Sequence, residues 1–324
     1  MSIRAAMTRR SLSASEAIDE VDSPVDGLED GSLSIIPSQT TGNVTDVWRR
    51  TTSITRRSLP QDGSVLVRFE IPYAHIMPPP NESSPTIKKY VMYDLSVRQD
   101  STKSTDPTPV TIERRYTDFS NLYEGLRAEH PTLLNQIPFP KKVFLGNFSA
   151  TLIAERSAAF EALLDHIMSL SDLRESSCFL QFLRDTELTK ACRLLDERRN
   201  EMAIPILEDC FRLLNKIFMD RSKSVLLLLC RLVAACTTSP VPHPSAEKWA
   251  ELALRRYDGV SDADLLTLYI PLIHTCVHLW WQRGRDNQFL QDRLKALENK
   301  GIPVKNGKTL TQAIHALDPR TETV

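Results

Sequence analysis

Two neighbouring arginines followed by a tyrosine form the first group of residues with the chemistry to bind an anion. Arg114, Arg115 and Tyr116 stand where a strand-like pattern gives way to a helical one. Adjacent side chains on a strand point to opposite faces of a sheet, so we expect only one of the two guanidinium groups to face a shared pocket. The alternation by itself does not say which one.

Arg156 is a second basic residue whose position calls for a partner. It follows Ile153 by three residues and precedes Phe160 by four, which puts it on the apolar side of a predicted helix. A charge on that side requires a counter-charge, hydrogen bonds or a path to water. Either its methylenes cover apolar surface while the head reaches water, or it pairs with an acid such as Glu155 or Asp165.

The segment 138–146 combines basic and apolar residues in what its prolines and glycine indicate is a loop. Two lysines, the second of them Lys142, are followed at once by Val143, Phe144 and Leu145. A run of exposed apolar residues requires an explanation. The loop either folds back on the core or enters a membrane with its lysines at the level of the headgroups.

These residues are embedded in a pattern of strands and then helices. Alternation of apolar and polar residues predicts strands around 65–71, 91–97 and 110–114, and their short connections favour an antiparallel meander. Helical periodicity follows around 119–126 and 153–167. We therefore predict an α+β fold, a three-stranded antiparallel meander with helices, in the first half of the chain.

Everything after residue 187 has a helical pattern, with about five or six amphipathic segments up to residue 299, joined by short loops and followed by a short C-terminal tail. Such a run is typical of stacked helical hairpins, and its spacing is loosely that of tetratricopeptide-type repeats without their signature residues. The sequence thus predicts a second, all-α domain over 187–324. Trp280 and Trp281 are adjacent at the end of one of these helices, so at least one of them should lie near the surface.

Composition limits the classes of function and of compartment. The 324 residues have a net charge of -1, so no overall basic field favours nucleic acid. The six cysteines lack the spacing of zinc ligands and are interpreted as buried thiols of a reducing compartment. The longest apolar stretch, 224–236, is too short to cross a bilayer. Residues 1–60 are rich in Ser and Thr without periodicity, and we interpret them as a disordered leader.

Motifs for catalysis are missing from the sequence. It contains no glycine-rich phosphate loop, no nucleophile elbow and no zinc-ligand spacing. We therefore expect a cytoplasmic binding protein that is not an enzyme, needs no cofactor or metal, and associates with membranes only peripherally.

Three motifs in order resemble one family. R-R-Y-x-D-F at the strand–helix junction, the proline loop with lysines and apolar residues, and I-x-x-R-x-x-x-F resemble a PX (phox homology) domain over about 61–186. The helical extension is similar to the PX-associated domain B of the sorting nexin twenty and twenty-one subgroup. The resemblance covers nearly everything except the leader.

The resemblance implies a pocket for an inositol lipid phosphorylated at position three. Arg115 would hold the 3-phosphate, and Tyr116 would stack on the inositol ring. Lys142 would meet the 1-phosphate, and Arg156 would bond the hydroxyls at positions four and five. The planar fork of donors on a guanidinium suits phosphate, and lysine acts as a compact charge.

The resemblance also gives Val143, Phe144 and Leu145 the role of entering the membrane. It implies an adaptor that binds phosphatidylinositol 3-phosphate on early endosomes and protein partners or cargo through the helical domain. The alternative is a protein-interaction scaffold whose PX fold reads no lipid, or one that prefers a more phosphorylated lipid such as phosphatidylinositol 4,5-bisphosphate.

Overall fold

The structure is a computed structural model that describes residues 33–34, 66–78, 89–100, 108–135, 137–143, 145–218, 220, 222–257, 263–305 and 307–320. Residues 32–324 form one compact unit. Apart from residues 33 and 34, the leader predicted for 1–60 lies outside the described residues.

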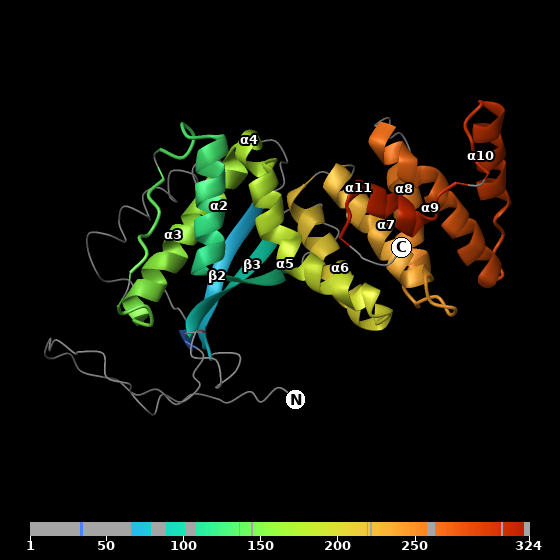
Figure 1. Cartoon of the computed structure of the whole chain (residues 1–324). Helices are drawn as coiled ribbons and strands as arrows, with labels where there is room; N and C mark the ends of the chain where they lie inside the picture. Colours follow the sequence, from blue (N-terminus) through green and yellow to red (C-terminus); the bar gives the residue numbers. More distant parts are fainter. Residues whose placement is uncertain are drawn as a thin grey trace, which may run out of the picture. The chain divides into compact units, whose positions relative to one another are not determined.

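The predicted antiparallel meander is confirmed. Its strands are β2 (Leu66–Met77), β3 (Tyr90–Asp100) and β4 (Val110–Arg115), paired in that order (Figure 1). A two-residue strand that was not predicted, β1 (Leu33–Ser34), pairs with β2 and makes the sheet four-stranded. The register of β2 against β3 shifts between Glu70 and Tyr73, where Pro72 has no N–H to donate to the ladder.

Two helices cover the apolar face of the sheet. Helix α2 (Tyr116–Glu129) follows β4 directly, and α3 (Ala150–Ser169) packs on β2. The rings of Phe119 and Phe160 stack at 3.9 Å, and Tyr93 of β3 meets Phe160 edge-on at 5.2 Å. The predicted apolar stripe of α3 is buried, which fixes the side of that helix that faces the sheet.

The rest of the chain is helical, as predicted. The helices are α4 (Ser171–Arg174), α5 (Ser177–Asp196), α6 (Asn200–Ile217), α7 (Lys223–Thr237), α8 (Ala246–Tyr257), α9 (Ala263–Gln282), α10 (Gln288–Asn299) and α11 (Leu310–Leu317). From α5 to α10 each helix packs on the next, and the unpredicted α11 returns to α7 and α9 (Figure 1). None of the helices in the described ranges is long and apolar enough to cross a bilayer.

Helix α5 crosses the predicted domain boundary, and helix α6 contains an internal proline. Helix α5 begins after Ser176, whose side chain accepts a hydrogen bond from the backbone N–H of Phe179, and then runs unbroken across residues 186 and 187. The predicted domain boundary at that point stays a prediction. Helix α6 begins at Asn200, so Pro205 lies in the helix interior.

A buried arginine joins the sheet to α5. The Arg114 side chain is 1% exposed, and its guanidinium donates to the carbonyls of Phe182 and Leu183 at 2.8 and 3.1 Å. Its two terminal nitrogens also bond the carboxylate of Glu187 at 2.6 and 2.7 Å. Arg114 therefore belongs to the packing between β4 and α5.

The cysteine thiols are expected to be inert in the folded protein. Burial raises the pKa of Cys210, Cys230 and Cys236 to about 12, and the thiolate is the reactive form. The prediction of buried thiols is confirmed for five cysteines, while Cys178 is half-buried. Iodoacetamide at pH 8 should modify these three thiols at least about 100-fold more slowly than in denaturant, measured by peptide mass spectrometry. Rapid modification of folded protein would contradict this burial.

Candidate functional site

The centre of the candidate site is a contact between Tyr116 and Arg156. Tyr116 is the first residue of α2, and its hydroxyl donates to the carbonyl of Pro140 at 2.8 Å. The guanidinium carbon of Arg156, from α3, lies 4.3 Å from the centroid of the Tyr116 ring. The ring is also within 6.1 Å of the rings of Phe139 and Phe160. Tyr116 is thus fixed by its hydroxyl and its ring, and it supports the arginine.

Arg156 is buried with hydrogen-bonding capacity to spare. It is 3% exposed, and its Nη1 donates to Oδ1 of Asn147 at 3.2 Å. Within the described part of the chain, Nε and Nη2 have no hydrogen-bond partner. A buried donor left empty costs about 1–3 kcal/mol, and more when it is charged. An acceptor-rich ligand would fill these donors.

Tyr93 places a second buried polar group beside Arg156. Its hydroxyl is buried and, among the described residues, without a hydrogen-bond partner. Burial raises the pKa of Tyr93, while the positive charge of Arg156 and a polar interaction between its guanidinium and the hydroxyl act in the opposite direction. Tyr93 was not predicted as a site residue, because its place in β3 is that of an ordinary core residue.

The loop before α3 is tied to this pair at two points. The first point is the hydrogen bond from the Tyr116 hydroxyl to the Pro140 carbonyl. The second is Asn147, whose Oδ1 accepts a hydrogen bond from Arg156. The Nδ2 of Asn147 also donates to the Val143 carbonyl at 3.1 Å, within the loop. Gly146 permits the turn before Asn147 because its φ of 73° is a left-handed conformation. Lys142 lies between the two tied points with an exposed side chain.

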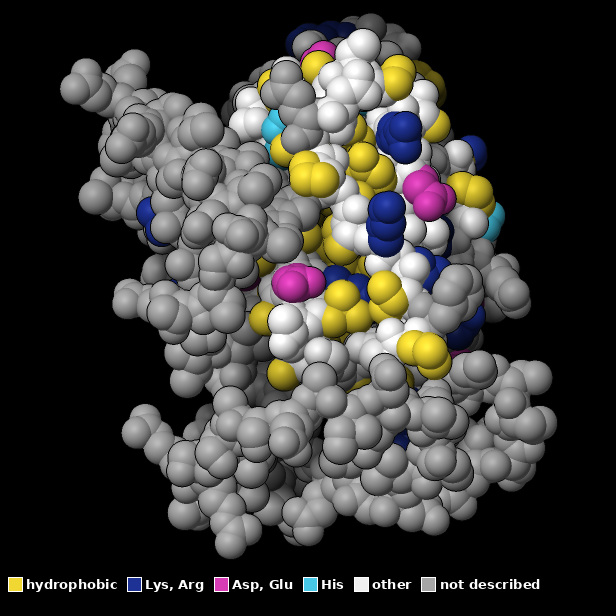
Figure 2. Space-filling view, turned by 90° about the vertical axis from the view of Figure 1, so that its left-hand side faces the viewer, with side chains coloured by type: hydrophobic (Ala, Val, Ile, Leu, Met, Phe, Trp, Pro, Cys, Tyr) yellow, Lys and Arg dark blue, Asp and Glu magenta, His cyan; other side chains and the backbone are white. Residues whose placement is uncertain are grey.

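The three residues predicted to enter the membrane differ in their exposure to solvent. Leu145 is 71% exposed, whereas Val143 is half-buried, and Phe144 lies outside the described residues. Phe148, which was not predicted, is 43% exposed on the same loop. Figure 2 shows the side of the molecule that carries α3, where lysine and arginine side chains lie among hydrophobic ones. The exposed loop thus has apolar and basic groups together.

The alternation of β4 separates the two arginines. Arg114 and its strand neighbours Val110 and Ile112 face inward, and Arg115 faces outward. The Nε of Arg115 lies 3.6 Å from the Asp118 carboxylate, and its side chain is 54% exposed. Among the described contacts none joins the Arg115 side chain to Arg156 or to Lys142. The place of Arg115 at the site therefore stays a prediction.

Comparison with known proteins identifies the family. The PX domain family matches residues 103–186, the range that holds Arg115, Tyr116, Lys142 and Arg156. Rat sorting nexin-20 is 30% identical over 228 residues, which cover 70% of this chain and 70% of that protein. This chain belongs to the sorting nexin family. Human sorting nexin-21 is 29% identical over 72% of this chain.

This sorting nexin covers only part of some relatives. It spans 60% of human sorting nexin-21 and 66% of the mouse protein. A designed CISK-PX domain of known structure aligns at 24% identity and a TM-score of 0.28, over 36% of this chain and 96% of that one. The PX match, the meander and the following helices together establish the predicted fold.

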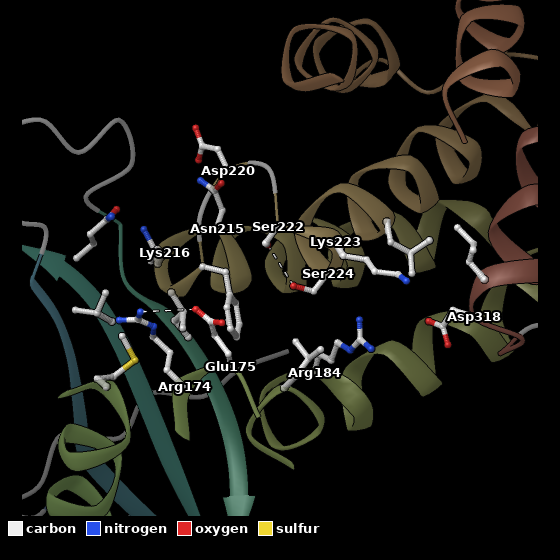
Figure 3. Close-up of a pocket in the computed structure, with 18 residues that line it drawn as sticks. Arg174, Glu175, Arg184, Asn215, Lys216, Asp220, Ser222, Lys223, Ser224 and Asp318 are labelled. Carbon is white, nitrogen blue, oxygen red and sulfur yellow. Dashed lines mark hydrogen bonds and ion pairs between the residues drawn. The ribbon is translucent and has the colours of Figure 1, made fainter. Parts of the chain in front are cut away.

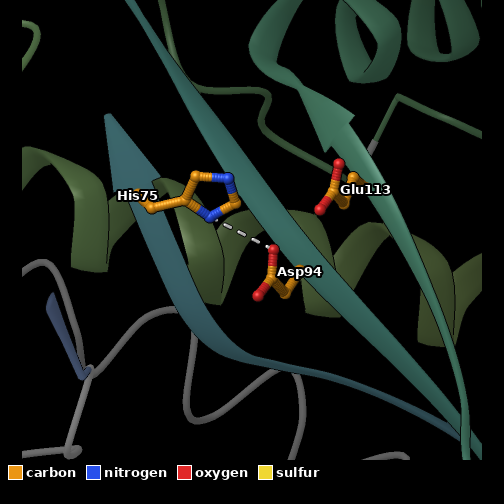
Figure 4. A group of neighbouring side chains, drawn as sticks. All are labelled: His75, Asp94 and Glu113. Atoms are coloured by element: carbon orange, nitrogen blue, oxygen red, sulfur yellow. Dashed lines mark ion pairs between the residues drawn. The ribbon is translucent and has the colours of Figure 1, made fainter. Parts of the chain in front are cut away.

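The sheet of this sorting nexin also brings together three side chains that suit a cation. His75, Asp94 and Glu113 come from β2, β3 and β4, and their possible ligand atoms lie within 4.8 Å of one another (Figure 4). His75 Nδ1 is 3.4 Å from Asp94 Oδ1, so these two groups already interact with each other. Burial raises the pKa of Asp94. The sequence analysis missed the group because only strand pairing brings its members together.

Of the two adjacent tryptophans, Trp280 is buried and Trp281 is 70% exposed. This confirms that at least one lies near the surface. The ring of Trp281 stacks on that of His278 at 6.0 Å. Trp281 is therefore available on the helical part of this sorting nexin.

Proposed function

We propose that this sorting nexin is a peripheral membrane adaptor in endosomal trafficking that binds phosphatidylinositol 3-phosphate. The observation that carries the proposal is the buried guanidinium of Arg156, held over Tyr116 with two donors empty. An inositol headgroup supplies hydroxyl and phosphate oxygens, which are the acceptors that such donors require. A bound headgroup would therefore replace the missing partners of Arg156.

Each predicted residue has a distinct task in this proposal. Arg156 donates to the ring hydroxyls at positions four and five, and Tyr116 supports the ring. Arg115 reaches the 3-phosphate from the outer side of the strand–helix junction, where its ion pair with Asp118 is exposed and easily exchanged. Lys142 meets the 1-phosphate from the loop. Guanidinium groups suit the forked contacts, and the lysine suits a point contact at the membrane surface.

Insertion of the loop adds a second contribution to membrane binding, beside recognition of the headgroup. Burial of an exposed leucine or phenylalanine, such as Leu145 or Phe148, contributes about 1.5–3 kcal/mol each, and a lysine near an anionic surface about 1 kcal/mol. Neither contribution alone gives a stable association. Headgroup recognition together with loop insertion gives reversible binding that depends on the lipid. Val143 and Phe144 are proposed to follow Leu145 into the interface.

The helical part, proposed as residues 187–324, would hold protein partners or cargo while the PX part holds the membrane. Helical hairpins present grooves between neighbouring helices, which suit peptides and helices of other proteins. Early endosomes are the proposed location, because phosphatidylinositol 3-phosphate is the proposed lipid.

Vesicle flotation of wild type and Arg115→Ala tests the proposal. Wild type should float with vesicles that contain phosphatidylinositol 3-phosphate and not with those that contain phosphatidylinositol. Loss of the charged hydrogen bonds of Arg115 should weaken binding by roughly 10- to 100-fold. The melting temperature should not change, since Arg115 is exposed.

Arg127→Ala is the matched control, because Arg127 is exposed at the other end of α2 and the charge change is the same. It should bind like wild type. Equal flotation of Arg115→Ala and wild type would overturn the headgroup assignment. Stronger binding to vesicles with phosphatidylinositol 4,5-bisphosphate would instead support the alternative selectivity.

A further inference from the structure

A groove of about 810 Å³ lies away from the lipid site, between the sheet and the helices that follow it (Figure 3). Its walls come from β2, β3 and α3 to α7, and from the end of α11. None of the four predicted headgroup residues lines it. The groove therefore offers a second surface, built jointly by the PX part and by the helices after it.

Arg184 and Asp318 line one end of the groove and belong to a cluster in which positive charge exceeds negative charge. Asp318 accepts from Arg320 at 2.8 Å and from Arg231 at 3.2 Å. The Oδ1 atom of Asp185 lies 3.1 Å from Nη2 of Arg320 but 3.7 Å from Nε of Arg184. Three arginines thus contact two carboxylates, those of Asp185 and Asp318. Arg184 makes the longest of these contacts.

One nitrogen of Arg184 is left without a hydrogen-bond partner in the described structure. Its side chain is 12% exposed, and within the described residues its buried Nε lacks a hydrogen-bond partner. Burial lowers the pKa of Arg184, and the like charge of Arg320 acts in the same direction. Figure 3 shows the Arg184 guanidinium directed into the gap between Lys223 and Asp318. An added anion at this point would relieve the local excess of positive charge.

The other walls of the groove are partly apolar. Val67, Leu180, Phe218 and Leu227 line it, together with polar residues such as Ser222. Two acids also line it, Glu175 and Asp220, and each has an arginine within 4.0 Å, Arg174 and Arg256 respectively. Its volume falls in the range of about 300–1,000 Å³ that is usual for sites that enclose a ligand. A complementary ligand therefore carries an anionic group next to an apolar one.

We propose that this groove binds a short acidic peptide segment of a partner protein. A carboxylate of the peptide lies between Arg184 and Lys223, and a neighbouring apolar side chain packs on Phe218 and Leu227. A flat bilayer surface does not fit, because the guanidinium of Arg184 is recessed between elements. The inference deepens the proposed adaptor role by giving the class of its protein partner, and it does not require the lipid site.

The test uses the full chain and a fluorescein-labelled peptide of alternating glutamate and leucine. Its control is the same peptide with glutamine in place of glutamate. Fluorescence anisotropy should show at least about tenfold tighter binding of the acidic peptide, with an affinity that falls as salt is added.

Lys223→Glu should weaken binding of the acidic peptide by at least about fivefold. This residue is exposed at the first position of α7, where a glutamate favours the helix, so the variant should fold. Lys190→Glu is the matched control, because Lys190 is exposed on α5 and does not line the groove. It should bind like wild type, and Arg184→Gln should bind like Lys223→Glu.

Equal binding by Lys223→Glu and Lys190→Glu would show a general charge effect and overturn the proposal, as would wild type that does not prefer the acidic peptide. Flotation separates the two sites. Lys223→Glu should float with phosphatidylinositol 3-phosphate vesicles as wild type does, and Arg115→Ala should bind the peptide normally. Loss of flotation by Lys223→Glu with unchanged peptide binding would assign the groove to the membrane instead.

Discussion

Replacing Arg156 with methionine is expected to abolish binding to phosphatidylinositol 3-phosphate while leaving the fold at least as stable as that of wild type. The substitution removes a buried charge whose Nε and Nη2 lack partners in the described structure. Relief of that cost, about 1–3 kcal/mol, offsets the loss of the Asn147 hydrogen bond and of the contact with the Tyr116 ring. The flexible methionine side chain fills the space left by the arginine stem.

The expected free energy of unfolding in urea is therefore equal to that of wild type or about 1 kcal/mol higher. Flotation should fall by roughly 100-fold or more, because several charged hydrogen bonds to the headgroup are lost together. Arg127→Met is the control for the lost charge and should bind normally. If Arg156→Met instead destabilised the protein by 3 kcal/mol or more, the arginine would be structural, and its empty donors would carry no argument for a ligand.

Replacing Arg114 with alanine is expected to cause a large loss of stability, in contrast to Arg156→Met, which should leave the fold as stable as wild type. This side chain satisfies the carbonyls of Phe182 and Leu183 and pairs with Glu187. Removing one member of a buried pair typically costs about 3–5 kcal/mol. Glu187 is 25% exposed and reaches water in part, which places the expected loss at the lower end of that range.

Urea denaturation of Arg114→Ala beside Arg115→Ala gives the sharpest comparison, since the two variants differ by one position. Arg115→Ala should change the free energy of unfolding by less than about 0.5 kcal/mol. Glu187→Gln should cost less than Arg114→Ala because it keeps a neutral acceptor for the arginine. A loss below about 1 kcal/mol for Arg114→Ala would mean that β4 and α5 are held together by their apolar contacts alone.

The strand pattern predicted the separation of the two arginines but not its direction. Alternation fixes only that neighbours differ in face. The direction depends on β3, where Tyr93 is paired with Arg114 on the core side, and on carbonyls almost 70 residues later in α5. Such long-range partners have no signature in the local sequence.

The burial of Arg156 followed from helical spacing, but its partners did not. The sequence suggested Glu155 or Asp165, which are neighbours on the same helix, or a path to water. The guanidinium instead contacts Tyr116 of α2 and Asn147 of the preceding loop. Helical periodicity assigns a side chain to a face, and only tertiary packing says what covers that face.

The helices were predicted better than the surfaces between them. Helix α5 continues across the predicted domain boundary at 186 and 187. Two of its polar side chains there meet partners on other elements, Glu187 with Arg114 and Asp185 with Arg320. Local pattern predicted neither the groove at Arg184 nor the short α11, whose last residue lines that groove. They depend on how segments far apart in the chain pack together.

The most direct test of the central claim follows the Nε–H group of Arg156 by nuclear magnetic resonance while a water-soluble dibutanoyl phosphatidylinositol 3-phosphate is added. The signal is assigned by its loss in Arg156→Met. We predict that it shifts and becomes protected from exchange as the headgroup saturates, and that dibutanoyl phosphatidylinositol without the 3-phosphate causes at least about tenfold less shift at equal concentration. An Arg156 signal that stays in place at saturation would show that the headgroup does not fill these donors.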